Sequence, residues 1–346
     1  MLDRPGAVDA PVGSPDHGMP WHYGDPFAEQ RAAARSVAVV DRSHREVLAV
    51  SGDDRLSWLH SLTSQDLASL ADGASTEALV LDVHGRVEHH AVVTHHGDTV
   101  WLDVERGTGQ ALLAYLEAMR FWSKVEPRDA TSELAVLSVV GPETARVIPE
   151  DVPGGFVRSM PWPGGQAADL LVPRAELPRW WDRVTSTGAR PAGSWAFDAL
   201  RVEALRPRLG VDTDDRTIPH EVNWIGHAVH LDKGCYRGQE TVAKVHNVGR
   251  PPRRMPLLHL DGSLDVLPDT GDPVLLDGRP VGRVGTAVRH HELGPIALAL
   301  VKRSVPVEAE LVAGTGDRAV PARIDPDSVP PDTPGLGREA ARNFGR

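Results

Sequence analysis

Short apolar runs separated by polar turns recur along the first third of the chain. Runs rich in Val and Leu and bounded by Gly, Asp or Ser predict strands, here at 36–41, 46–52, 77–83, 86–94 and 99–104. One helix is expected to begin at the sequence SGDD, and a second is predicted in residues 107–119. In the second, apolar residues recur at i, i+3, i+4 and i+7, as Leu112, Tyr115, Leu116 and Met119. Strands with crossing helices favour an α+β sandwich.

The pattern changes twice further along the chain. The middle third holds a strand and three helix candidates, at 134–140, 142–148, 194–205 and 239–245. From Met255 onward only short strand-like runs remain, punctuated by Gly, Pro and Asp, with DGR as a hairpin turn. This pattern predicts a small antiparallel barrel. The basic sequence GRPPRR at 249–254 marks its expected boundary.

Composition narrows the class of protein. The 346 residues are 41% hydrophobic and 25% charged, with a net charge of -11, which predicts a folded chain of two or three domains without a membrane span. No secretory signal is recognised, so a cytoplasmic location is expected. The Pro- and Gly-rich ends, 1–20 and 325–346, are expected to be tails, the first of them disordered. The acidic surface disfavours general nucleic-acid binding; GRPPRR could contact tRNA, but a solvated linker is the preferred interpretation.

Four histidines lie on one predicted strand, in the pairs His89/His90 and His95/His96. Alternation along a strand places His90 and His96 on one face and His89 and His95 on the other. Residues six apart on a strand are about 20 Å apart, too far to share a metal ion. We therefore expect solvated histidines on an exposed sheet face and assign no metal site.

The sequence LRVEALRPRLG contains a first candidate for chemistry. Arg201 and Glu203 stand two apart near the end of a predicted helix. Residues two apart on a helix do not face each other, so we do not expect both charges to be used in one local salt bridge, and one of them should be available for another role. A carboxylate can accept two parallel hydrogen bonds from a ring amide and its amino group, as in the pterin of folate. An ordinary solvated helix face is the alternative interpretation.

The single cysteine provides the second candidate. Cys235 lies in KGCYRGQE, between Gly234 and Gly238 and just before a predicted short helix. The helix dipole and the flanking cations Lys233 and Arg237 would favour its thiolate, so we expect an accessible, acidic thiol. The alternative is a packed turn, because free cysteine is among the most buried residue types.

KGCYRGQE resembles the signature of the YgfZ family of folate-binding proteins, which support iron-sulfur enzymes and a tRNA-modifying methylthiotransferase. The resemblance extends through LRVEALRPRLGVD, TIPHEVNW and GRPVGRVGTAV, and so covers most of residues 35–325. It implies a three-domain, aminomethyltransferase-like cloverleaf of class α+β, with two interleaved α/β domains and a C-terminal antiparallel β-barrel. The implied segments are 21–50 with 131–205, 51–130 with 206–250, and a barrel at 254–324.

The resemblance also implies roles for residues. Glu203 aligns with the pterin-binding glutamate of the aminomethyltransferase superfamily, with Arg201 beside it, and Cys235 aligns with the cysteine that defines the YgfZ group. The remaining motif residues are Lys233, Gly234, Tyr236, Gly238, Gln239 and Glu240. Where the aminomethyltransferases have an acidic pair, this chain has His89 and His90 in GRVEHH, and imidazole does not replace a carboxylate without altering charge and pKa. This departure argues against a conventional aminomethyltransferase.

Three functions follow from the resemblance. The first is a tetrahydrofolate-binding factor that supports iron-sulfur client enzymes through Cys235. One thiolate cannot hold a cluster alone, because such clusters generally take four protein ligands. The second is a folate-dependent aminomethyltransferase or other one-carbon transferase acting on a small amine. The third is a folate-binding scaffold in which Cys235 only packs.

Overall fold

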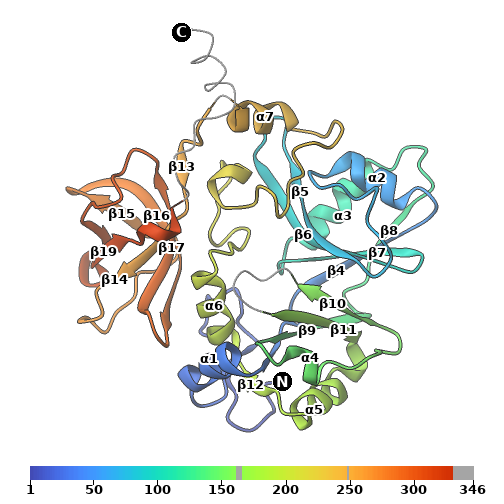
Figure 1. The fold of residues 1–346 in the computed structure, drawn as a ribbon, viewed down its shortest axis with the longest axis horizontal. Helices are drawn as coiled ribbons and strands as arrows, with labels where there is room; N and C mark the ends of the chain where they lie inside the picture. Colours follow the sequence, from blue (N-terminus) through green and yellow to red (C-terminus); the bar gives the residue numbers. More distant parts are fainter. Residues whose placement is uncertain (161–165, 248, 330–346) are drawn as a thin grey trace. The chain divides into compact units, whose positions relative to one another are not determined.

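The structure is a computed structural model that describes residues 1–160, 166–247 and 249–329 (Figure 1). The chain divides into two compact units, each made of segments that are separated in the sequence. Unit 1 contains Met1–His60, Asp66–Ala78 and His90–Leu200, and unit 2 contains Ser61–Gln65, Leu79–His89 and the chain from Arg201 onward. No helix in the described ranges is long and apolar enough to cross a membrane.

The first sheet of unit 1 explains why segments distant in sequence share a domain. Its strands, in the order β10-β11-β9-β3-β12, are β10 (Phe156–Met160), β11 (Ala167–Pro173), β9 (Leu134–Val140), β3 (Ala38–Asp41) and β12 (Arg190–Ala192). Only the β3–β12 pair is parallel. Strand β3 thus joins an early segment to a sheet otherwise built from residues 134–192, which is the interleaving that the resemblance implies.

Helices surround this sheet. They are α1 (Pro26–Arg35), α4 (Thr144–Val147), α5 (Leu177–Ser186) and α6 (Ser194–Glu203), with a 3-10 turn η1 (Arg174–Glu176) before α5. Helix α1 begins where Asp25 accepts a hydrogen bond from the Ala28 amide and Pro26 occupies the first turn, a favourable helix start. Helix α5 contributes Trp180, Trp181 and Val184 to the core, and this burial fixes it against β-strands rich in Val and Leu.

The second sheet carries the meander predicted from the sequence. Its order is β5-β6-β7-β4-β8, formed by β5 (Ser75–Leu81), β6 (Val87–His96), β7 (Thr99–Val104), β4 (Glu46–Ser51) and β8 (Glu126–Asp129). Helices α2 (Arg55–Leu62) and α3 (Gly109–Ala118) accompany it. Leu112 and Leu116 of α3 are fully buried, so the predicted apolar stripe is confirmed at these two positions.

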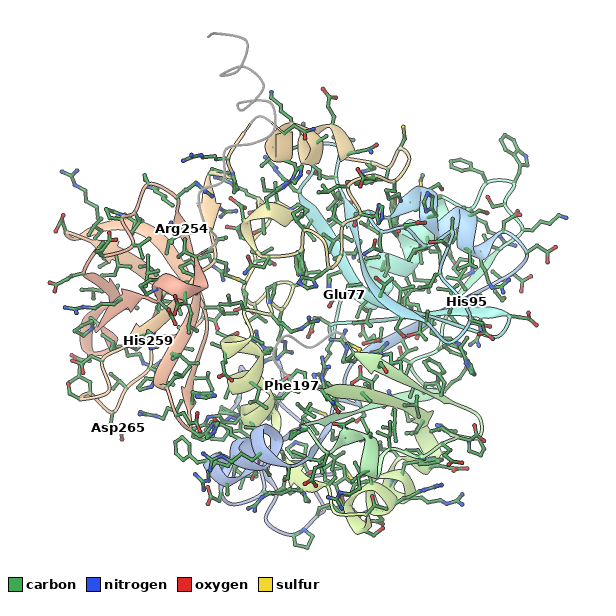
Figure 2. The ribbon with its side chains drawn as sticks, in the orientation of Figure 1. Glu77, His95, Phe197, Arg254, His259 and Asp265 are labelled. Atoms are coloured by element: carbon green, nitrogen blue, oxygen red, sulfur yellow. The ribbon has the colours of Figure 1, made fainter. Side chains whose placement is uncertain are left out.

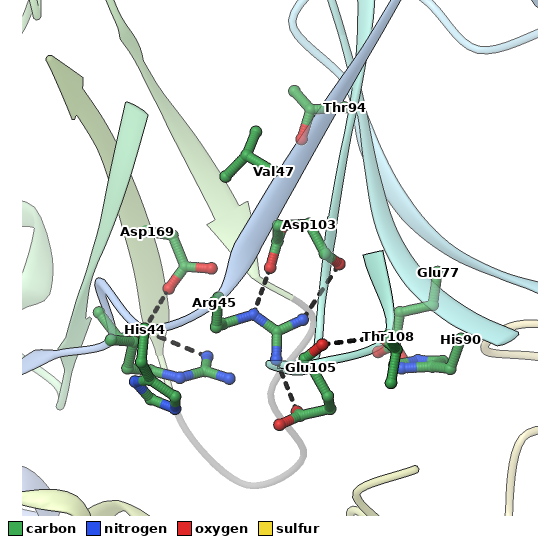
Figure 3. Close-up of polar contacts among 12 residues, drawn as sticks. His44, Arg45, Val47, Glu77, His90, Thr94, Asp103, Glu105, Thr108 and Asp169 are labelled. Atoms are coloured by element: carbon green, nitrogen blue, oxygen red, sulfur yellow. Dashed lines mark hydrogen bonds and ion pairs between the residues drawn. The ribbon is translucent and has the colours of Figure 1, made fainter. Parts of the chain in front are cut away.

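A buried ion network lies inside unit 1 (Figure 3). Arg158 of β10 contacts both Asp103 of β7 and Asp169 of β11, and Arg45 contacts Asp103 and Glu105. Each of these side chains is almost entirely buried. Opposite charges lower the pKa of Asp103 far below its usual range despite its burial, so the carboxylate stays ionised and links the two sheets.

The N-terminal residues differ from the expected disordered tail. Strands β1 (Val8–Asp9) and β2 (Pro20–His22) pair antiparallel, and Ala10 and Met19 are buried. Trp21 stacks on Trp195 with 4.6 Å between ring centroids. The Pro and Gly residues that suggested disorder instead form the turns of an ordered segment whose few apolar side chains pack on unit 1.

Unit 2 contains the predicted barrel. Strands β14 (Leu257–Leu260), β15 (Pro273–Leu276), β16 (Arg279–His290), β17 (Gly294–Lys302), β18 (Leu311–Ala313) and β19 (Val320–Ile324) are joined in the order β17-β14-β19-β18-β15-β16. Pairing of β16 with β17 closes the ring, and β13 (Arg253–Arg254) extends it. The expected hairpin turn is confirmed at Asp277 and Gly278, which both have positive φ.

Shorter elements complete unit 2. They are η2 (Pro219–Glu221), α7 (Gln239–Asn247), η3 (Gly316–Arg318) and η4 (Pro326–Ser328). Of the expected C-terminal tail, Asp325–Val329 is described, and the Ser328 hydroxyl accepts a hydrogen bond from the Leu257 amide. Residues 330–346 of that predicted tail lie outside the described residues.

Candidate functional site

The end of helix α6 is anchored by Arg201. Its guanidinium pairs with Asp212 at 2.8 Å, donates to the Arg206 carbonyl at 3.0 Å and contacts the hydroxyl of Thr286 on β16. Its side chain is buried. The residue assigned from sequence to the cofactor therefore holds protein groups together, and its charge is balanced inside unit 2.

A bulge in β16 makes this anchor possible. The pairing register shifts between Val284 and Ala287, which releases the Thr286 amide from the ladder. That amide donates to Asp212 at 2.7 Å, the carboxylate that also holds Arg201. A Cβ on Gly285 would lie 2.3 Å from the same carboxylate, so this close approach requires glycine.

Glu203 differs from Arg201 in being accessible. Its side chain is 48% exposed, and its Oε2 atom lies 3.3 Å from Nε2 of His290. The neighbouring His290 ring lowers the pKa of the Glu203 carboxyl, which outweighs the opposite effect of partial burial. The two residues thus differ in their surroundings: Arg201 contacts protein groups, and the ionised carboxylate of Glu203 is half-exposed at the helix end.

The KGCYRGQE loop is held in place by its own motif residues. The buried Lys233 amine donates to the carbonyls of Thr63 at 2.5 Å and Gln65 at 3.2 Å, and the Gln239 amide donates back to the Lys233 carbonyl. Tyr236 is buried beneath the loop, with the Lys233 amine 5.0 Å from its ring centroid. These contacts fix the loop between a buried lysine and the start of α7.

Cys235 is exposed and free. Its accessibility agrees with the sequence interpretation of a displayed thiol and differs from a packed turn. The two cations expected to act on it are engaged elsewhere: Lys233 on backbone carbonyls, and Arg237 on Glu88 at 2.7 Å. Glu240 and Gly234 are also exposed, so the loop presents a short stretch of surface around the thiol.

The histidines of β6 are not all solvated. His90 is buried and its Nε2 lies 2.8 Å from Glu77 (Figure 3). His95 is also buried, with Nδ1 3.0 Å from the Leu70 carbonyl. The expectation of an exposed histidine face is wrong for these two residues, because partners from neighbouring segments cover them. Burial and the charge of Arg237 lower the pKa of His89 to about 4. Across the described residues, no group of three or more potential ligands could hold a metal ion.

The basic GRPPRR sequence is largely used within unit 2. Arg253 forms ion pairs with Asp214 and Glu221, at 2.5 and 2.8 Å, and Arg254 donates to the Val305 carbonyl at 2.6 Å (Figure 2). Arg253 is therefore committed to acidic partners in its own unit, which weakens the argument for a tRNA contact at this sequence.

Comparison with known proteins places this geometry in a family context. Residues 3–154 match the model of the GCVT N-terminal domain. An aminomethyltransferase of Herpetosiphon aurantiacus is 27% identical over 329 residues, which cover 88% of this chain and 90% of that protein. These matches support a relationship between this chain and the aminomethyltransferase T-protein superfamily.

Two further comparisons bear on this superfamily. A putative chloroplastic transferase of Arabidopsis thaliana is 26% identical over 272 residues, covering 72% of this chain and 61% of that protein. The solved structure of glycine cleavage system aminomethyltransferase T from Bartonella henselae is 20% identical, with a TM-score of 0.80 and coverage of 95% of this chain and 96% of that one. The expected aminomethyltransferase-like fold, barrel included, is thereby confirmed.

Sequence reasoning missed the partners of Glu203 and Arg201. These partners are Asp212, Thr286 and His290, of which Asp212 lies in the acidic GVDTDD and His290 in the pair HH at 290–291. Nothing local relates these residues to α6. Their role depends on the pairing of a barrel strand with a helix end, which periodicity does not report.

Proposed function

We propose that this protein binds tetrahydrofolate in unit 2 and acts on one-carbon units that the folate carries, with Glu203 as the recognition carboxylate. The observation that carries the proposal is the ionised, half-exposed carboxylate at the end of α6. It can accept paired hydrogen bonds from the ring amide and amino group of a pterin. The relatives named aminomethyltransferase support the same reaction class.

The proposed substrate is a small amine. Its reaction would not use the acidic pair of the aminomethyltransferases. His89 stands where the resemblance places an acid, and its low pKa of about 4 leaves it uncharged at neutral pH. A neutral imidazole can accept a proton or a hydrogen bond but supplies no negative charge to hold an ammonium group. We therefore propose transfer of a one-carbon group from the amine nitrogen to tetrahydrofolate with its oxidation level unchanged and the amine as leaving group, by a route that does not use the acidic pair of a conventional aminomethyltransferase.

Calorimetric titration with tetrahydrofolate, and with its more stable 5-formyl derivative, tests the proposal. Glu203→Gln is expected to weaken binding by about tenfold to a hundredfold, because a hydrogen bond to a charged acceptor contributes roughly 1.5–3 kcal/mol. Glu310→Gln is the control, since Glu310 is an exposed glutamate paired with Arg323 on the barrel. Wild-type protein that binds neither folate rejects the proposal, and unchanged binding by Glu203→Gln rejects the role of Glu203.

The reaction itself needs a separate assay. Formation of methylenetetrahydrofolate from aminomethyl compounds, or of methyltetrahydrofolate from N-methyl amines, followed with purified protein, would support the transferase proposal directly. Folate binding without turnover of any amine would favour the second candidate function below.

The second candidate is support of iron-sulfur enzymes, as in the YgfZ family, and the exposed thiol of Cys235 in a rigidly held KGCYRGQE loop favours it. The thiol would act in reversible oxidation, shared ligation or contact with a client enzyme, because one thiolate is too few for a cluster.

Complementation tests this second function. In cells lacking the gene, we expect wild-type protein to restore tRNA methylthiotransferase activity and Cys235→Ser to restore only a minor part of it at equal abundance. Cys235→Ala separates loss of the thiol from gain of a hydroxyl. Full rescue by both variants would assign Cys235 no chemical role, and no rescue by wild type would remove the iron-sulfur function.

A further inference from the structure

We infer that His290 is a positioning residue for the folate-recognition carboxylate: its buried Nε2 atom, which has no hydrogen-bond partner of regular geometry among the described residues, lies 3.3 Å from one oxygen of Glu203 and leaves the other oxygen for the ligand. The inference rests on the proposed function, since it assigns a partner to the carboxylate that recognises folate. His290 stands at the end of β16, far from Glu203 in sequence, and the two side chains meet within unit 2 at 3.3 Å.

The hydrogen bonds of the His290 ring determine which of its nitrogens carries the hydrogen. Nδ1 of His290 accepts hydrogen bonds from the backbone amides of Glu292 and Leu293, at 3.2 and 3.1 Å. A neutral imidazole has one donor and one acceptor nitrogen, so its hydrogen must be on Nε2. Nε2 is the atom next to the Glu203 carboxylate, and the ring therefore offers a donor there whether or not it is protonated.

Burial makes this donor a fixed one. The side chain of His290 is 1% exposed, whereas that of Glu203 is 48% exposed. The His291 ring lies beside it, with 4.5 Å between centroids. A ring held by two backbone amides and covered on its sides keeps one orientation, so it can restrict the rotamers of the glutamate that would otherwise move freely at a helix end.

The same strand also contacts the other residue at the end of α6 that lies in unit 2, Arg201. Thr286 and His290 are four residues apart on β16, and they contact Arg201 and Glu203, respectively, at the end of α6. Asp212 joins Arg201 to the Thr286 amide. Strand β16 thus sets both the backbone position of the helix end, through Arg201, and the side-chain position of Glu203, through His290.

The charges around Glu203 predict how binding depends on pH. His290 and His291 lower the pKa of its carboxyl, and Glu292 raises it to a smaller extent. A carboxyl with a lowered pKa remains ionised as the pH falls toward its ordinary value of about 4.3. Loss of the imidazole returns the pKa upward, so folate binding should then fail at a higher pH than in the wild type.

Two substitutions distinguish the role of Nδ1, which accepts hydrogen bonds from the turn, from that of Nε2, which lies next to Glu203. In His290→Asn the amide oxygen can replace Nδ1 as acceptor for Glu292 and Leu293, but nothing reaches Glu203. In His290→Gln the longer amide can donate to Glu203 while the turn loses its acceptor. The first variant should keep its fold and lose positioning, and the second should lose some stability and keep positioning.

The experiment measures the dissociation constant of 5-formyltetrahydrofolate from about pH 4 to about pH 7.5, with thermal melting as the check of folding. We expect His290→Asn to bind about three- to tenfold more weakly at neutral pH and to lose binding at a higher pH than wild type, whereas His290→Gln binds nearly as wild type does.

The outcomes distinguish the inference from the function on which it rests. A folded His290→Asn variant with wild-type affinity and an unshifted pH profile overturns the role of His290 while leaving the proposed function intact. Loss of binding by a folded His290→Gln variant likewise counts against the role. Absence of binding by the wild type overturns both together.

Discussion

Replacement of Arg158 by methionine is expected to lower the free energy of unfolding by about 3–5 kcal/mol, the usual cost of removing one partner from a buried ion pair. Arg158 contacts Asp103 and Asp169, and all three side chains are almost fully buried. Without it, Asp169 keeps the hydrogen bond from the Ser138 hydroxyl at 2.6 Å, and Asp103 keeps Arg45. Urea unfolding followed by tryptophan fluorescence measures the loss.

Two controls make this prediction specific. Arg179→Met removes an exposed ion pair with Glu176 and should cost less than about 1 kcal/mol. Adding Asp169→Asn to Arg158→Met should recover part of the loss, because it removes the uncompensated charge. If Arg158→Met lowers the free energy of unfolding by no more than Arg179→Met does, water reaches the network and its burial does not strengthen the ion pairs.

The same network gives stability a defined pH dependence. Its ion pairs depress the pKa of Asp103 in the folded state, so this carboxylate contributes stability above its unfolded pKa of about 3.9 and loses it as the pH falls toward the folded value. The difference in unfolding free energy between wild type and Arg158→Met should therefore narrow in acid, which repetition of the unfolding series below about pH 4 would check.

The parts of the fold that the sequence predicts well are those governed by local patterns. The stripe of α3 is visible because Leu112 and Leu116 recur with the period of a helix. The barrel hairpin is visible because Asp277 and Gly278 tolerate positive φ. Such signals depend on neighbours in the chain and need no knowledge of tertiary contacts.

The parts that the sequence predicts poorly depend on partners that are distant in the chain. His90 is buried because Glu77 lies beside it, and the N-terminal segment is ordered because Trp21 stacks on Trp195. At the candidate site the sequence identifies Glu203 and Cys235, but their surroundings come from elsewhere. Only the fold brings His290 next to Glu203, and a carboxylate on a helix face gives no sign of such a partner.

In the KGCYRGQE motif, some residues hold the loop in place and others face solvent. Lys233, Tyr236 and Gln239 bind or pack against the protein, while Gly234 and Cys235 face solvent. Gly238 has a φ of 81° and lies so close to the 82–85 turn that a Cβ would be 2.6 Å from the Asp82 carbonyl oxygen and 2.9 Å from the Gly85 Cα. A motif of this kind positions an exposed thiol through residues that do no chemistry.

Gly238→Ala is accordingly expected to destabilise the protein by about 2–5 kcal/mol, since strain of about 1–2 kcal/mol from positive φ adds to overpacking of about 1–3 kcal/mol. Gly234→Ala is the matched control: no atom lies within 4 Å of its added Cβ, so its stability should change by less than about 0.5 kcal/mol. Thermal and urea unfolding compare the two variants, and alkylation of Cys235 reports on the loop. Equal stabilities would mean that the turn at 82–85 yields to a methyl group and that the motif glycine is not required by packing.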